Sequence, residues 1–214
     1  VAESVLMSIS IDPDRPKVLI AESVHPEYRQ TLAPYLANLS KEIVTLPTPG
    51  GALDPDELKK QLDGKTLCVI VQHPNFFGNL EAVDAISKLC NETGALFVVS
   101  FDAISVGVLK RPGQYVGNPM AFGGPYLGLM ACRDQFVRKI PGRLVGQTVD
   151  RNNKRCWVLT LQTREQHIRR EKATSNICTN QGLFALRAAV YLAALGPQGL
   201  RETADLCLQK AHYL

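Results

Sequence analysis

Two uninterrupted apolar runs decide the fold: TLCVIVQ at 66–72 and ALFVVSF at 95–101. A run without alternating polar residues is typical of a strand that is covered on both faces of its sheet. Residues 79–93 lie between the runs and have helical spacing, and Gly94 is expected to end this helix because glycine adopts the left-handed conformation at low cost. A strand, a helix and a second strand at this spacing along the chain predict a right-handed crossover between parallel strands.

The same alternation extends toward the start of the chain. KVLIAE (17–22) and EIVTLP (42–47) are predicted strands. Pro26 suits the first position of a helix, and Pro34 in its interior predicts a kink or an early end. A further helix is expected over 54–63, where an acidic N-cap precedes a proline. We therefore predict an α/β fold with three α/β/α layers and a mostly parallel sheet.

The second half of the chain shows a weaker pattern. YLGLMAC (126–132) is predicted to form another strand, with an antiparallel orientation after a turn as one option. Residues 110–125 contain four glycines and three prolines and no strand-like run. An α/β domain seldom has so long a connection without an element. Either this stretch is a functional loop, or residues are missing between Tyr115 and Val116.

Both ends of the chain have helical spacing. The first nine residues suggest a helix in progress, and two helical stretches, 181–195 and 197–214, follow near the end, separated by Gly196 and Pro197. The last stretch has no stop signal. We expect 1–214 to be a single large domain that is a fragment of a longer chain; a mature chain with frayed ends is the alternative.

Composition excludes several classes of protein. The chain has 214 residues with 45% hydrophobic residues, which is too apolar for disorder. Its net charge of +4 is too mild to suggest nucleic-acid binding, and its apolar runs are shorter than the ~18–20 residues of a membrane span. The six cysteines include no CxxC pair and the four histidines are scattered, so we expect no metal site, and reduced thiols in the cytoplasm.

Polar residues follow the two apolar runs, at the edge where a parallel sheet binds ligands. His73 and Asn75 follow the first run, and Asp102 follows the second. Asp102 is either a helix N-cap or a carboxylate that pairs with a protonated ring nitrogen. Asn75 is either a turn residue or a ligand contact, and His73 alone is more often a packed or turn histidine than a catalyst.

Two further segments carry candidate binding residues. The loop FGGPYLG, with Gly123 and Gly124, is either a turn or a backbone cradle for an anion. The segment 164–172 mixes basic and acidic residues and is either a solvated helix face or an interface that leads into a polar run at 174–176. Its interleaved acids and lack of aromatic residues argue against nucleic acid.

The arrangement of Asn75 and Asp102 resembles pyridoxal-phosphate enzymes of the aspartate-aminotransferase type. Such enzymes need a Schiff-base lysine after the Asp, and neither Lys110 nor Lys139 is suitably placed. Longer motifs resemble the glycine cleavage system P-protein family, in particular its first (α) subunit in the two-subunit bacterial form. These motifs are AESVHPEYR (21–29), PNFFG (74–78), FGGPYLG (122–128), PGRLVG (141–146) and QHIRREKATSNICTNQ (166–181).

This resemblance implies an oxidoreductase complex with the large-domain fold of fold-type I pyridoxal-phosphate-dependent transferases. The family decarboxylates glycine on pyridoxal phosphate and passes the aminomethyl group to the lipoyl arm of H-protein. Subunit 2 holds the cofactor and its lysine in an α2β2 assembly, so subunit 1 is non-catalytic, binds no cofactor as this fragment, and shapes the shared site. The fragment alone is expected to be inactive.

The resemblance also suggests roles for particular residues. The expected cofactor-like pseudo-site consists of His73, Asn75, Asp102, Gly123 and Gly124. Residues expected to contact the partner subunit or the carrier are His167, Arg169, Arg170, Thr174, Ser175, Asn176 and Asn180. The family has further residues between Tyr115 and Val116, and segments on both sides of this chain. Two alternatives stay open: a self-sufficient pyridoxal-phosphate enzyme whose lysine lies outside these residues, and a scaffolding α/β module.

Overall fold

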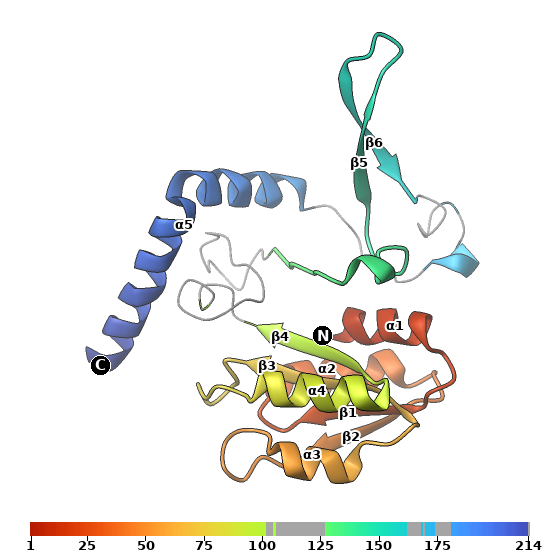
Figure 1. Ribbon diagram of the computed structural model, residues 1–214, viewed down its shortest axis with the longest axis vertical. Helices are drawn as coiled ribbons and strands as arrows, with labels where there is room; N and C mark the ends of the chain where they lie inside the picture. Colours follow the sequence, from red (N-terminus) through yellow and green to blue (C-terminus); the bar gives the residue numbers. More distant parts are fainter. Residues whose placement is uncertain (102–104, 106–126, 162–167, 169, 174–180, 214) are drawn as a thin grey trace.

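The computed structural model describes residues 1–101, 105, 127–161, 168, 170–173 and 181–213. Its centre is a four-stranded parallel sheet with the strand order β2-β1-β3-β4 (Figure 1). The strands are β1 (Lys17–Ala21), β2 (Glu42–Leu46), β3 (Thr66–His73) and β4 (Leu96–Phe101). The four predicted strands in this half of the chain are confirmed.

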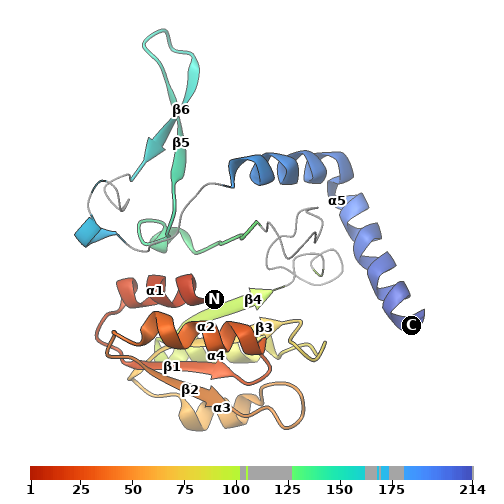
Figure 2. The same ribbon diagram turned by 180° about the vertical axis from the view of Figure 1, so that it is seen from behind.

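Helices cover both faces of the sheet. One face carries α1 (Ala2–Ile11) and α2 (Pro26–Leu36), and the other carries α3 (Pro55–Gln61) and α4 (Val83–Thr93), as the opposite views of Figures 1 and 2 show. The chain winds outward from β1 to β2 and then returns past β1 to β3, so the direction reverses between β1 and β3. The predicted three-layer α/β/α fold is confirmed.

The hydrophobic core lies between these layers. β3 is its centre, because residues 66–71 are buried on both faces of the sheet. Burial of one such aliphatic side chain contributes about 1.5–3 kcal/mol. Helix side chains close the two faces: Val5 and Leu32 on one side, Leu58 and Ile86 on the other.

Local capping explains where the helices begin and end. Pro26 and Pro55 occupy first-turn positions, and Asp54 Oδ1 accepts a hydrogen bond from the Asp56 amide at 2.9 Å. Gly94 ends α4 with φ of 70°, in the left-handed conformation expected of it. Pro34 lies in the last turn of α2, so the predicted early end is confirmed at Leu36.

Two predictions about elements are wrong. Residues 79–82 are not helical, and α4 begins only at Val83, because the side chains of Asn79 and Glu81 bond to neighbouring loops. Residues 127–132 form no strand. Leu129 and Met130 instead line a groove together with residues of α1 and β4, among them Met7 and Phe97.

A β-hairpin that the sequence pattern did not reveal follows this groove. β5 (Leu144–Val149) and β6 (Arg155–Thr160) pair in antiparallel register and project away from the sheet (Figure 1). Asp150 Oδ1 organises the turn by accepting the amides of Asn152 and Lys154 at 2.8 and 2.9 Å. One face of the hairpin exposes apolar side chains to solvent, and these are Val145, Val149, Trp157 and Leu159.

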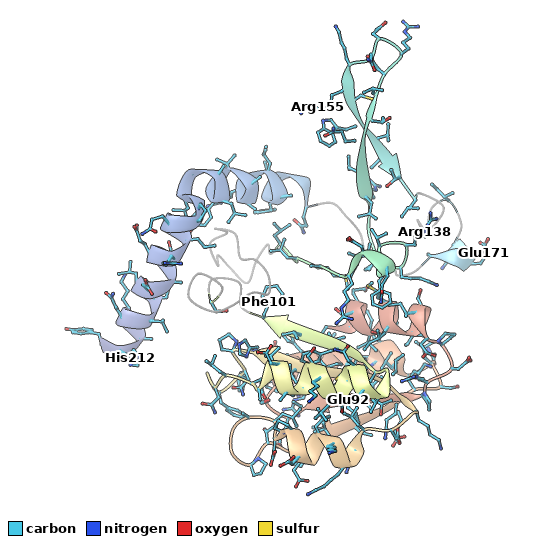
Figure 3. The ribbon with its side chains drawn as sticks, in the orientation of Figure 1. Glu92, Phe101, Arg138, Arg155, Glu171 and His212 are labelled. Atoms are coloured by element: carbon cyan, nitrogen blue, oxygen red, sulfur yellow. The ribbon has the colours of Figure 1, made fainter. Side chains whose placement is uncertain are left out.

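The side chains of the hairpin and of the short turns around it are drawn in Figure 3. Arg155 lies over the ring of Trp157, with its guanidinium carbon 6.0 Å from the ring centroid. Two 3-10 turns, Asp134–Phe136 and Arg170–Lys172, flank the hairpin in the chain. The hairpin therefore presents a mixed aromatic and basic surface outside the main sheet.

The described chain ends in α5 (Gly182–Tyr213), which bends at Gly196. Gly196 has φ of 60° and ψ of −174°, so it interrupts the helix just before Pro197, and the predicted pair of helices is confirmed. By length and composition alone, α5 is the one described helix that could cross a membrane. The bend leaves two segments that are each shorter than the ~20 residues of a straight span.

Two core cysteines provide a test of this packing. Burial raises the pKa of both the Cys68 and the Cys90 thiol to about 12, so neither forms the reactive thiolate near pH 8. We expect a thiol reagent at pH 8 to modify exposed Cys207 in the native protein and to reach Cys68 and Cys90 only after unfolding. Peptide mass spectrometry would assign each modified cysteine, and rapid native labelling of Cys68 would contradict the core described above.

Candidate functional site at the carboxyl edge of the sheet

Three loops meet where the parallel strands end. They follow β1, β2 and β3 and comprise residues 22–25, 47–54 and 74–82. Phe101, the register partner of His73 on β4, marks this edge in Figure 3. Ligands of open α/β sheets bind at this edge, close to the point where the strand order reverses. The arrangement of these loops therefore defines the candidate site.

A buried carboxylate holds the three loops together. Glu81 is only 4% exposed, and its Oε1 accepts hydrogen bonds from Ser23 Oγ at 2.6 Å and from Asn75 Nδ2 at 2.8 Å. Its Oε2 accepts the backbone N–H of Leu53 at 2.8 Å. Within the described residues no cation forms an ion pair with Glu81. Neutral donors from three separate loops therefore stabilise this carboxylate.

Asn75 completes this network with its side-chain amide. Its Nδ2 also donates to the carbonyl of Gly51 at 2.7 Å, while its Oδ1 accepts the amides of Phe77 and Asn79, both at 3.0 Å. An amide side chain has two N–H donors and two acceptor positions, so every position is occupied. The Asn75 side chain thus bonds within the turn and to the loop after β2, and its assignment as a cofactor contact stays a prediction.

His73 ends β3 and is half-buried. Its Nδ1 accepts the backbone N–H of Glu81 at 3.1 Å, and the peptide bond to Pro74 is cis. The loop after β1 is attached to β3 in a similar way, because Gln72 Oε1 accepts the backbone N–H of His25 at 2.9 Å. His73 is thus a predicted site residue that is only half-buried at this edge.

Aromatic side chains form the outer surface of the site. The His25 ring lies edge-on to Phe76 with centroids 4.8 Å apart, and Tyr28 and Phe77 extend the contact. Phe76 and Phe77 are 48% and 59% exposed even though their backbone N–H groups are bonded to Ser23 and Asn75. We call His25, Tyr28, Phe76 and Phe77 the aromatic surface. Sequence reasoning missed it, although two adjacent phenylalanines before Gly78 were a usable signal for an exposed turn.

The other predicted site residues lie outside the part of the chain that the structure describes. These are Asp102, Gly123, Gly124, His167, Arg169, Thr174, Ser175, Asn176 and Asn180, together with the Tyr115–Val116 junction. Arg170 is described and lies exposed in a 3-10 turn after the hairpin. The assignment of these residues to a pseudo-site or an interface therefore stays a prediction.

The lysine content of the site bears on cofactor binding. None of the three described loops contains a lysine, and Lys139 lies exposed just after the 3-10 turn Asp134–Phe136. The Asn75 amide, another predicted pseudo-site group that is described, is fully bonded to its own loop and to Gly51 of the loop after β2. The three described loops therefore supply no lysine that could hold pyridoxal phosphate covalently.

Comparisons with known proteins give a consistent result. The profile of the family described as "Glycine cleavage system P-protein" matches residues 1–214. "Probable glycine dehydrogenase (decarboxylating) subunit 1" of Carboxydothermus hydrogenoformans is 51% identical over 99% of this chain and 50% of the relative. The protein of the same name from Thermomicrobium roseum is 49% identical over the whole of this chain. The chain thus spans about half the length of the curated relatives it matches.

The alignment with the Thermomicrobium protein runs over 225 residues, although this chain has 214. That relative therefore carries residues that have no counterpart here.

Solved structures agree with the sequence comparison. The crystal structure of an inhibitor-bound glycine decarboxylase (P-protein) of the glycine cleavage system superposes with a TM-score of 0.84 at 46% identity, over 94% of this chain and 47% of that one. Mouse CSAD superposes with a TM-score of 0.62 at 16% identity, over 99% of this chain and 48% of that one, which supports the fold alone.

Proposed function

Because this chain belongs to the glycine cleavage system P-protein family, we propose that it is part of a non-catalytic subunit 1 of glycine dehydrogenase (decarboxylating). The observation that carries the proposal is the carboxyl edge itself. There the Asn75 amide is fully bonded within two of the loops, and the described loops offer no lysine to a cofactor. The fold of a cofactor enzyme is thus present, and among the described residues the loops at this edge supply no lysine to hold the cofactor covalently.

The proposed activity belongs to a complex in the cytoplasm. A second subunit holds pyridoxal phosphate, which supplies the electron sink for loss of CO₂ from glycine. The H-protein carrier accepts the aminomethyl group on its lipoyl arm, and two copies of each subunit assemble as α2β2. Relatives whose names contain "subunit 1" support a partner subunit.

The part assigned to this chain is to build one wall of a shared site. The buried Glu81 network keeps three loops in fixed relative positions, and the aromatic surface lies on the outside of these loops. Exposed aromatic side chains on a rigid base are typical of surfaces that contact a partner and exclude water. No covalent step is assigned to a residue of this chain.

Reconstitution with the second subunit would test this division of labour. Neither subunit alone should exchange labelled CO₂ into glycine, whereas the mixture supplied with pyridoxal phosphate and H-protein should. Borohydride reduction followed by peptide mapping should place the reduced cofactor on the second subunit. Reduced cofactor on this chain, or CO₂ release by this chain alone, would show that it is a self-sufficient enzyme.

A further inference from the structure

The hydrogen bond between Glu81 and His73 determines where the His73 ring carries its proton. A backbone N–H can only donate, so the Nδ1 that lies 3.1 Å from the Glu81 nitrogen must be the acceptor. In a neutral imidazole one nitrogen accepts and the other carries hydrogen, so the proton of His73 is on Nε2. Among the residues that the structure describes, none is bonded to that Nε2.

Glu81 is well suited to hold this arrangement because it is bonded at both ends. Its backbone N–H bonds to His73, and its carboxylate accepts Ser23, Asn75 and Leu53. Glu81 as a whole is only 4% exposed within these contacts, so its backbone has little freedom to move away from the ring. Outer groups that fix the tautomer and orientation of a histidine are common in binding sites.

We propose that Glu81 is a positioning residue that holds His73 as an Nε2–H donor at the carboxyl edge. The ligand that this donor suits is an acceptor oxygen, such as the carboxylate of a small amino acid bound at this edge. That ligand assignment rests on the proposed function, whereas the tautomer assignment follows from the hydrogen bonds alone. His73 contacts the ligand, and Glu81 acts through His73.

Nitrogen-15 spectroscopy of the histidine rings tests the tautomer directly, in the full-length chain labelled on histidine. At alkaline pH, where imidazole is neutral, His73 should show an unprotonated Nδ1 and a protonated Nε2. His73→Phe assigns the signal. In Glu81→Gln the side-chain amide cannot accept all three donors, so the backbone at position 81 is held less firmly. The His73 signals should therefore shift toward a mixture of tautomers. A His73 ring protonated on Nδ1 in the native protein would overturn the proposal.

The chain offers two controls for this measurement. His25 Nδ1 accepts the Glu27 amide at 3.2 Å, a contact within its own helix turn, so its tautomer should not change in Glu81→Gln. Glu92→Gln replaces an exposed glutamate on α4 and should change neither ring. If Glu81→Gln does not fold, Ser23→Ala removes one donor to the carboxylate and should give a smaller shift in the same direction.

Kinetics of the complex test the ligand part. Glu81→Gln keeps the His73 ring and weakens its bond to the ligand only in part, which corresponds to about a threefold to tenfold change in an equilibrium. We therefore expect Glu81→Gln to raise KM for glycine by about this factor with kcat changed less than about twofold. An unchanged KM with an altered tautomer would overturn the ligand assignment. A native complex that does not act on glycine would instead contradict the proposed function, and the tautomer result would stand.

Discussion

Replacing Ile70 by alanine is expected to lower the free energy of unfolding by about 2–5 kcal/mol. Ile70 is fully buried at the middle of β3, between Ile20 on β1 and Val98 on β4. Alanine removes three carbon atoms from a site with layers packed on both faces of the sheet, so the neighbours cannot collapse fully into the space. Urea unfolding followed by circular dichroism would measure the change.

The control for this substitution lies on the surface. Leu183 is 74% exposed near the start of α5, so Leu183→Ala should change the free energy of unfolding by less than about 0.5 kcal/mol. Equal losses for the two variants would contradict the placement of Ile70 in the core. The slope of the unfolding free energy against urea should stay the same in both, since the surface exposed on unfolding is unchanged.

Replacing Asn75 by alanine is expected to cost about 2–4 kcal/mol and to loosen the carboxyl edge. The substitution removes four hydrogen bonds at once and leaves the amides of Phe77 and Asn79 without their acceptor. Hydrogen exchange should accelerate in peptides that cover 47–54 and 74–82, while peptides of β1 and β3 keep their protection. Denaturant unfolding would give the change in stability.

The isosteric variant Asn75→Asp keeps the size of the side chain and changes only its hydrogen-bonding groups. Asn75→Asp places a carboxylate oxygen where Nδ2 now lies, 2.8 Å from Glu81 Oε1. Two carboxylates at this distance repel each other, which raises the pKa of one of them in the folded state. The variant should therefore be less stable than Asn75→Ala at neutral pH and regain stability as the pH falls. Asn152→Ala, at an exposed turn position in the hairpin, serves as the matched control for Asn75→Ala. An equal loss of stability in Asn75→Ala and Asn152→Ala would contradict the network.

Local patterns account for most of the sheet and its helices. The strands at 17–21, 66–73 and 96–101 coincide with apolar runs, and Gly94 ends α4 as its residue type predicts. Sequence reasoning failed at 127–132, where apolar residues line a groove instead of pairing as a strand. It also missed the hairpin, because a two-stranded ribbon with both faces largely exposed lacks the alternation of a half-buried sheet.

The candidate site divides in the same way. His73 and Asn75 could be found because they follow a predicted strand, where parallel sheets place their ligand-binding loops. Their partners could not be found: Ser23 bonds to Glu81 across 58 residues, and Asn75 bonds to Gly51 across 24. Neither separation corresponds to a helix or strand period or to a sequence motif. Glu81 itself lies in a segment that the sequence suggests is helical.

The amino-acid sequence by itself determined the parallel α/β architecture, because apolar strand runs and helix caps can be recognised from neighbouring residues. Its long motifs also determined the family. Only the tertiary structure decided what the polar residues at the carboxyl edge do. Parallel strands that are distant in the chain end side by side, so their loops share buried donors and acceptors. In that setting the Asn75 amide donates to the Glu81 carboxylate, and His73 Nδ1 accepts the Glu81 backbone N–H.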